Sequence, residues 1–282
     1  MAGFVILFII ADMFFTATNP VGNSWLFPKN DFEKTIAAKG TSKFEKVFYG
    51  GSMVVAAYRE PLSGSGYVEM GMDYGKTSYL LKMLEQGLIT VSGEIVMGMN
   101  YFSFLDSLET NPGYIWHKKF YEPYVYFCRD RLKVFFTDAL SNILNGKYRL
   151  NRYYETEKYR YSGVWTDAEL DERIVVHSGR FWGLELSAFE GNFSALEELI
   201  DYCARSGIRL RGVWMPYNPY CPVPAIYAQV MDKANSIMDA HGVEHIDMTG
   251  AYPREYFHDL GHLNYEVGAV AFTKEIDLWL TS

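Results

Sequence analysis

Short, almost continuously apolar runs alternate along the chain with longer stretches whose apolar residues recur every three or four positions. Runs of the first kind are typical of strands buried on both faces, and stretches of the second kind are typical of covering helices. The predicted strands are Lys46–Tyr49, Tyr67–Met72, Glu94–Met99, Ile208–Met215 and Val243–Met248. The predicted helices are Met53–Tyr58, Thr77–Gln86, Phe193–Arg205, Val223–Ala240 and Glu266–Leu280. This alternation predicts an α/β fold of three layers, α/β/α, around a parallel sheet of about five strands.

An insertion of about 80 residues, Tyr101–Trp182, interrupts the alternation between the third and fourth strands. It is rich in tyrosine, phenylalanine and tryptophan, and we expect it to be mostly helical. Because it starts at the carboxyl end of a parallel strand, where ligands bind in such sheets, we expect it to overhang the site. Most of its aromatic side chains are expected to form its own core, and a minority to line a substrate groove. The predicted organisation is one α/β domain over 21–282 with an insertion at 101–182.

The segment Gly3–Thr16 is strongly apolar and has one charged residue, Asp12. It is shorter than the roughly 20 residues of a membrane span and lacks the basic start of a signal peptide. Residues 1–20 are therefore read either as a membrane anchor or as a buried N-terminal helix. Lysines follow this segment closely and favour a cytoplasmic position for the rest of the chain, which conflicts with the extracytoplasmic location expected below.

Composition narrows the choice of function. The 282 residues include 26 Lys and Arg against 34 Asp and Glu, which gives a formal net charge of −8. This balance argues against nucleic-acid binding, which normally requires a basic surface. The three cysteines lie too far apart in sequence for a disulfide framework or a zinc site, and the glycine-rich stretch Gly71–Thr77 lacks the spacing of a phosphate-binding loop. No cofactor and no metal are expected.

Residues that could carry chemistry stand at the ends of the predicted strands. Ser52 follows Gly50-Gly51 after the first strand, Gly75 follows the second, and Asn100 follows the third. Near the C-terminus, Asp259 precedes His262 by three residues, so its carboxylate can accept from one ring nitrogen while the other faces Ser52. Each signal alone is weak, but the carboxyl ends of parallel strands share one sheet edge. The coincidence predicts a serine nucleophile with a His–Asp pair.

These blocks resemble those of the SGNH (GDSL-like) hydrolase superfamily. They read Val47–Ser52, Gly75, Gly98-Met99-Asn100-Tyr101 and Asp259–Asn264, with Gly51 and Tyr101 at positions where the family usually has aspartate. The resemblance implies a flavodoxin-like fold, with Ser52 as nucleophile, His262 as general base and Asp259 as the residue that orients it. It also implies an oxyanion hole made by the Ser52 N–H, the Gly75 N–H and the Asn100 side chain.

The loose first block, the apolar N-terminus and the sequence Trp214–Pro219 are similar to an envelope branch of that superfamily. This branch includes the D-alanine transfer protein of teichoic-acid modification and alginate O-acetylation factors. The resemblance implies a membrane-anchored, extracytoplasmic esterase or O-acyltransferase acting on a small acyl ester, such as acetyl, of an envelope glycan. The alternative is a non-catalytic glycan-binding or scaffold subunit that partners a membrane acyltransferase.

Overall fold

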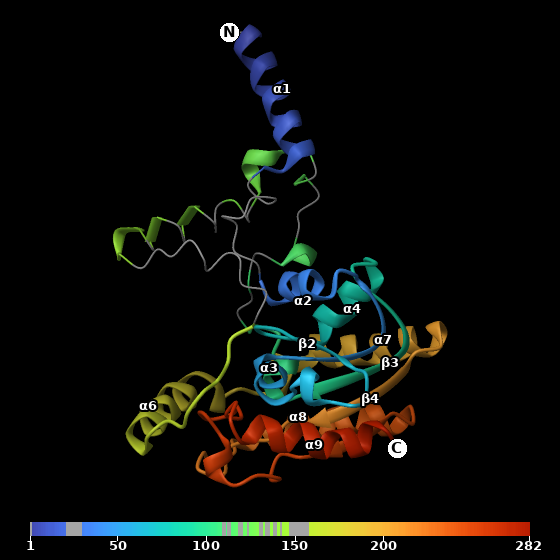
Figure 1. Cartoon of the computed structure of the whole chain (residues 1–282), viewed down its shortest axis with the longest axis vertical. Helices are drawn as coiled ribbons and strands as arrows, with labels where there is room; N and C mark the ends of the chain where they lie inside the picture. Colours follow the sequence, from blue (N-terminus) through green and yellow to red (C-terminus); the bar gives the residue numbers. More distant parts are fainter. Residues whose placement is uncertain are drawn as a thin grey trace. The chain divides into compact units, whose positions relative to one another are not determined.

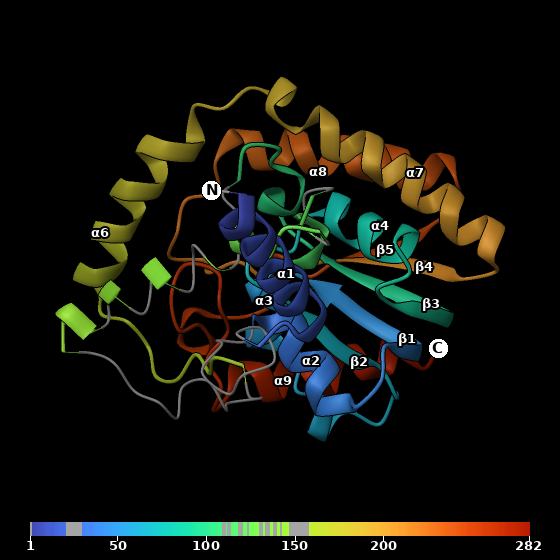
Figure 2. The ribbon, with the colours of Figure 1, turned by 90° about the horizontal axis from the view of Figure 1, so that it is seen from above.

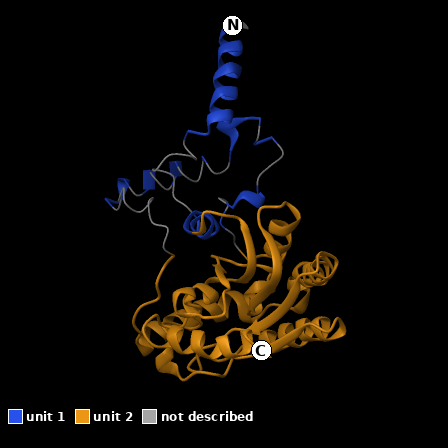
Figure 3. Cartoon of the chain, turned by 45° about the vertical axis from the view of Figure 1, so that its right-hand side comes forward, with its two compact units in different colours: residues 1–38, 111–157 blue, residues 39–110, 158–282 orange. Residues whose placement is uncertain are grey.

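The chain forms two compact units, residues 1–38 with 111–157 (unit 1) and residues 39–110 with 158–282 (unit 2), coloured separately in Figure 3. The structure, a computed structural model, describes residues 2–20, 30–108, 111, 114–117, 121–122, 124–129, 132, 136–137, 140–141, 143–146 and 158–282. Residues 147–157 of the predicted insertion lie outside the described part. The two ends of that insertion, 101–110 and 158–182, belong to unit 2, whereas residues 111–157 group with the N-terminal segment.

Unit 2 contains a five-stranded sheet in which every neighbouring pair of strands is parallel, with the order β2-β1-β3-β4-β5. The strands are β1 (Lys43–Gly50), β2 (Val68–Gly71), β3 (Thr90–Met99), β4 (Arg209–Trp214) and β5 (Glu244–Asp247). Each predicted strand is present, and the predicted parallel α/β sheet is confirmed. In this flavodoxin-like order, β2 is added on one side of β1, and β3, β4 and β5 are added on the other. In folds of this kind, ligands bind in the crevice at the carboxyl ends of the two strands where the order reverses, here β1 and β3.

Helices cover both faces of the sheet, as Figures 1 and 2 show. The helices of this unit are α3 (Ser52–Ala57), α4 (Thr77–Glu85), α6 (Asp167–His177), α7 (Glu190–Ser206), α8 (Ala225–Ala240) and α9 (Gly268–Leu280). One face carries α4, α7 and α8, and the other carries α3 and α9. Short helical turns link these elements: η1 (Glu60–Leu62), η2 (Tyr101–Phe104), η6 (Ser178–Trp182), η7 (Leu186–Phe189) and η8 (Arg254–Tyr256).

Strand residues that point to opposite faces are buried alike. Val47 and Phe48, adjacent in β1, are both fully buried, and so are Ile95 and Val96 in β3. Phe48 and Val96 join a core cluster with Phe272 of α9. Burial on both faces explains why these strands read as continuous apolar runs instead of alternating ones.

Unit 1 includes α1 (Ala2–Thr18), most of α2 (Asp31–Lys39), η3 (Ile115–His117) and η4 (Tyr126–Cys128). Apolar side chains of α1, among them Phe4 and Leu7, are exposed. Its one charged residue, Asp12, is buried and accepts hydrogen bonds from the N–H groups of Tyr126 (3.0 Å) and Phe127 (3.4 Å). Within the described residues, we find no helix with both the length and the apolar character needed to cross a membrane.

Candidate active site

The register of the sheet places Ser52 and Asn100 just beyond the ends of two adjacent strands, at one edge of the sheet. Gly50 of β1 pairs with Gly98 of β3, and Ser52 and Asn100 each follow their paired glycine by two residues. Both glycines are required by packing, because a Cβ on Gly98 would collide with Val54 of α3, and one on Gly50 would lie 2.6 Å from the Gly98 carbonyl oxygen. The close approach of β1, β3 and α3 therefore brings both polar side chains to the same pocket at the sheet edge.

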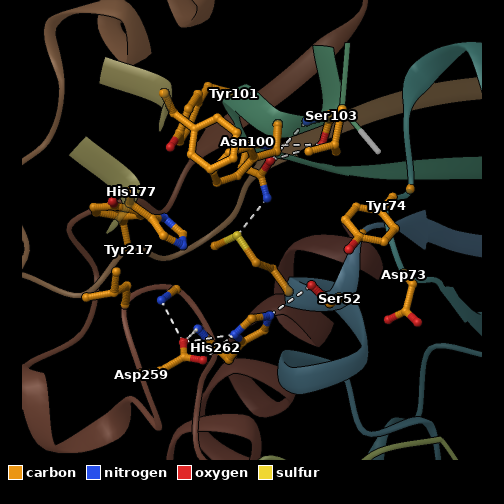
Figure 4. Close-up of a pocket in the computed structure, with 18 of the residues that line it drawn as sticks. Ser52, Asp73, Tyr74, Asn100, Tyr101, Ser103, His177, Tyr217, Asp259 and His262 are labelled. Atoms are coloured by element: carbon orange, nitrogen blue, oxygen red, sulfur yellow. Dashed lines mark hydrogen bonds and ion pairs between the residues drawn. The ribbon is translucent and has the colours of Figure 1, made fainter. Parts of the chain in front are cut away.

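Ser52, His262 and Asp259 form a continuous hydrogen-bonded chain (Figure 4). His262 Nε2 lies 2.8 Å from Ser52 Oγ, and His262 Nδ1 lies 2.8 Å from both Asp259 carboxylate oxygens. With Nδ1–H donating to the carboxylate, Nε2 is left as the acceptor for the Ser52 hydroxyl. The three side chains thus have the connectivity of a serine hydrolase triad.

Asp259 is fixed by its own loop. Its carboxylate also accepts from the backbone N–H groups of Gly261 (3.0 Å) and His262 (2.9 Å), and its carbonyl accepts from Asn218 Nδ2 (2.8 Å). Burial disfavours the charged form, but the attraction of His262 and these hydrogen bonds outweigh it and hold the pKa of Asp259 well below its ordinary value. The carboxylate therefore stays ionised beside His262.

An aromatic ring packs flat against the His262 imidazole. The Tyr161 ring stacks on the His262 imidazole, with centroids 4.1 Å apart and planes 6° from parallel. The Tyr161 carbonyl accepts from the Tyr265 N–H at 2.8 Å, which ties this part of the insertion to the loop after His262. Sequence reasoning missed Tyr161 because it lies about 100 residues from His262 in a segment without strand or helix periodicity.

The Asn100 amide is oriented by Ser103. Asn100 Oδ1 accepts from the Ser103 N–H (3.0 Å), and the Asn100 N–H donates to Ser103 Oγ (3.2 Å), which makes a capping box at the start of η2. With its oxygen held in this way, the amide NH₂ is directed at Met53 Sδ, 2.7 Å away at the pocket surface (Figure 4). Ser103 thus fixes the orientation of the Asn100 amide. This capping box could have been predicted from the sequence, because Ser103 follows Asn100, the N-cap residue, by three positions.

Gly75 sits against the end of β1. A side chain there would collide with the carbonyl of Gly50, so only glycine brings its N–H this close. A Cβ placed on Gly51 would lie 3.7 Å from the Gly75 nitrogen. Tyr74, just before it, has a left-handed backbone with φ of 56°, which turns the chain back toward Ser52.

All five predicted residues (Ser52, Gly75, Asn100, Asp259 and His262) line one pocket of about 360 Å³. Aromatic side chains from both ends of the insertion line it as well: Tyr101, Phe102, Tyr161 and Phe181. His177, for which the sequence offered no partner, also faces the pocket; its ring contacts Phe102 and Phe181 with centroids 5.9 and 5.5 Å away. The ends of the insertion in unit 2 therefore form part of the pocket wall.

No group of three or more histidine, cysteine, aspartate or glutamate side chains suited to a metal ion occurs among the described residues. Comparison of the chain with protein-family models and with curated proteins returned no match in either case.

Proposed function

We propose that the protein is a serine esterase or O-acyltransferase of the SGNH type that cleaves or transfers a small acyl ester, such as acetyl, on a cell-envelope glycan. The unbroken chain from Ser52 Oγ through His262 to the Asp259 carboxylate, with both links at 2.8 Å, carries the proposal. The exposed apolar side chains of α1 support the envelope location, because they offer a surface for a membrane or a membrane partner.

In the first half-reaction, His262 Nε2 takes the proton of Ser52 Oγ as this oxygen attacks the ester carbonyl carbon. The carbonyl π bond opens and leaves an oxyanion. When the intermediate collapses, the bond to the alcohol oxygen breaks, and His262 returns the proton to that oxygen. The product is an alcohol and an acyl ester on Ser52. Asp259 keeps its charge throughout and stabilises the imidazolium that forms between the two proton transfers.

The oxyanion would be stabilised by the Asn100 amide and by the N–H groups of Ser52 and Gly75. Donors that are already oriented cost little reorganisation, and one such donor contributes about 3 kcal/mol in measured cases. The capping box of Asn100 and the tight packing of Gly75 supply this preorganisation.

In the second half-reaction, His262 activates water or a sugar hydroxyl, which attacks the acyl-Ser52 carbonyl and releases the serine. Hydrolysis and transfer use the same residues and differ only in the acceptor. Aromatic rings such as Phe102 and Phe181 at the pocket wall favour a sugar ring over bulk water, because aromatic faces pack against the apolar faces of sugars.

A fluorophosphonate probe, which modifies only activated serines, tests the proposal. The wild-type protein should be labelled, Ser52→Ala should not, and His262→Gln should label much more slowly. Labelling that survives in Ser52→Ala would exclude Ser52 as the nucleophile. Failure of the folded wild-type protein to react would favour the non-catalytic glycan-binding alternative.

A further inference from the structure

The donors of the proposed oxyanion hole come from two separate segments. Gly75 lies in the turn between β2 and α4, and Asn100 lies between β3 and η2. Strand β1 separates β2 from β3 in the sheet, so strand pairing does not join the two segments directly. Contacts outside the sheet must therefore help to set the distance between the Gly75 N–H and the Asn100 amide.

Two side chains at the start of α4 tie these segments together. Lys76 Nζ donates to the Asp106 carbonyl at 2.9 Å, and Thr77 Oγ1 donates to the Ser103 carbonyl at 3.3 Å. Ser103 is the capping-box partner of Asn100 (Figure 4), and Asp106 follows the last residue of η2 by two positions. Both tethers therefore run from residues directly after the glycine donor to the turn that carries Asn100.

The Lys76 tether belongs to a closed ring of hydrogen bonds. The Asp106 carboxylate accepts from Asn192 Nδ2 at 2.7 Å, and Asn192 Oδ1 accepts from the Ser78 N–H at 3.0 Å. Ser78 follows Lys76 by two residues, so the ring returns to the start of α4. Lys76 and Asn192 are both buried, so breaking one link would leave a buried polar group unsatisfied. The ring therefore holds the two segments at a fixed separation.

The turn between β2 and α4 is also held from the sheet. The Tyr49 hydroxyl of β1 donates to the Lys76 carbonyl at 2.6 Å, and the Met72 N–H donates to the Gly50 carbonyl at 3.0 Å. Tyr49 is buried, and burial raises the pKa of its hydroxyl, which therefore stays protonated as a donor. Between these two bonds, Tyr74 keeps a left-handed backbone, a strained conformation that persists only where neighbouring contacts enforce it.

The two tethering side chains do not line the pocket. Lys76 and Thr77 are buried at the end of the stretch Gly71–Thr77, whose spacing does not fit a phosphate-binding loop. Both side chains donate to backbone carbonyls instead. Burial lowers the pKa of Lys76, because an ammonium away from water costs free energy that an apolar side chain would not. What the ammonium supplies at this position is its bond to Asp106.

We propose that Lys76 and Thr77 are positioning residues that hold the Gly75 N–H and the Asn100 amide at the spacing that one oxyanion needs. Donors that are fixed in advance cost little reorganisation when the charge develops. Without the tethers either segment could shift, and a small displacement of a catalytic group slows a reaction strongly. The inference rests on the proposed function and extends the residues on which kcat depends beyond the pocket wall.

Single substitutions test the proposal through acetate release from 4-nitrophenyl acetate. Lys76→Met should lower kcat about 10-fold, the effect of losing a hydrogen bond to a charged group, and should leave KM nearly unchanged. Thr77→Val keeps the side-chain shape and should lower kcat about 2- to 10-fold, whereas Thr77→Ser should retain most of the rate. Lys82→Met, at an exposed lysine of α4, is the matched control and should keep the wild-type kcat. Each kcat is expressed per site labelled at completion by the fluorophosphonate probe, so unfolded protein does not contribute.

A double-mutant cycle with Asn100→Ala shows whether the tether acts through the oxyanion hole. Lys76→Met should lower kcat much less in Asn100→Ala than in the wild-type protein, because the donor that it positions is already gone. An equal factor in both backgrounds would overturn the inference, and so would a wild-type kcat in both Lys76→Met and Thr77→Val. Each of these results leaves the serine esterase intact. A wild-type protein that neither releases acetate nor takes the label would instead reject the proposed function, and the inference with it.

Discussion

The Tyr161 ring lies parallel to the His262 imidazole, 4.1 Å from it, on a segment that joins the active-site loop through the bond between the Tyr161 carbonyl and the Tyr265 N–H. Asp259 fixes one edge of the imidazole, and the stack fixes its plane. Together they hold the imidazole in one orientation, with Nε2 directed at Ser52. Under the proposed function, Tyr161 is therefore a positioning residue that acts through His262.

Tyr161→Ala should lower kcat for acetate release by about 3- to 10-fold, since an aromatic pair contributes about 0.5–1.5 kcal/mol. KM should change little, because a positioning effect on the base acts on the chemical step. Tyr161→Phe keeps the ring and should retain most of the rate. If the phenylalanine variant were as slow as the alanine variant, the stack would not be the cause.

Removing the Asn100 amide should lower kcat more than removing the Tyr161 ring does. If the proposed function holds, Asn100→Ala lowers kcat by about 10²- to 10³-fold, as loss of one oxyanion donor does in serine hydrolases. Ser103→Ala keeps the donor and loosens it, so we expect a loss of about 2- to 10-fold. Ser92→Ala, at the opposite end of β3, is the matched control. If Ser103→Ala and Ser92→Ala lowered kcat equally, the capping box would not be what orients the Asn100 amide for catalysis.

The positions of the triad residues could be predicted because they depend on local signals that the sheet combines. A strand that ends in glycine, a serine after it and an Asp-x-x-His loop are each visible in the sequence, and parallel strands place their ends at one edge. The sequence alone does not show that Gly50 pairs with Gly98, and this pairing is what brings Ser52 and Asn100 to one pocket.

The support of the triad could not be predicted, because it comes from segments without periodicity. Tyr161 and Asn218 reach the Asp259–His262 loop from distant, irregular stretches, and only the folded chain shows which side chains meet. Helix α6 has a readable capping box at Thr166 and Glu169, yet nothing in its sequence identifies the pocket that Arg173 faces. Tertiary contacts decide such placements, and a single sequence does not record them.

Acid should destabilise the wild-type protein partly through Asp259. Its folded-state pKa lies well below the ordinary 3.8, so below about pH 4 the unfolded chain binds a proton that the folded chain does not. The stabilisation is present above that pH and is lost as the pH falls further, by up to about 1.4 kcal/mol per pH unit. Asp259→Asn lacks this contribution. Urea unfolding at pH 7, 4 and 3 should show that the difference in the free energy of unfolding between the wild-type protein and Asp259→Asn becomes smaller as the pH falls. A difference that stays constant would contradict the lowered pKa of Asp259.

A buried ion pair should dominate the stability of the sheet's other end. The Arg211 side chain is fully buried, pairs with Glu94 and donates to the carbonyls of Trp279 (2.9 Å) and Leu280 (3.1 Å). Arg211→Met leaves Glu94 charged and buried, so we expect a loss of about 3–5 kcal/mol in the free energy of unfolding. The double variant Arg211→Met/Glu94→Gln should recover part of this lost free energy of unfolding. If the losses measured for Arg211→Met alone and Glu94→Gln alone simply add in the double variant, the two side chains are not coupled.

Under the proposed function, the size of the acyl group that the pocket accepts should depend on Met53. Its buried side chain accepts the Asn100 amide at Sδ, and a Cβ placed on Gly261 would lie 3.5 Å from its Cε, so it fills the space between these two parts of the pocket. Met53→Ala should raise the butyrate-to-acetate ratio of kcat/KM on 4-nitrophenyl esters by about 10-fold, since each buried methylene contributes about 0.8 kcal/mol. Met53→Leu, which keeps the volume, should leave the ratio near that of the wild-type protein. The ratio is independent of how much protein is folded, so a destabilised variant still gives a valid answer. An unchanged ratio in Met53→Ala would show that another side chain limits the acyl group.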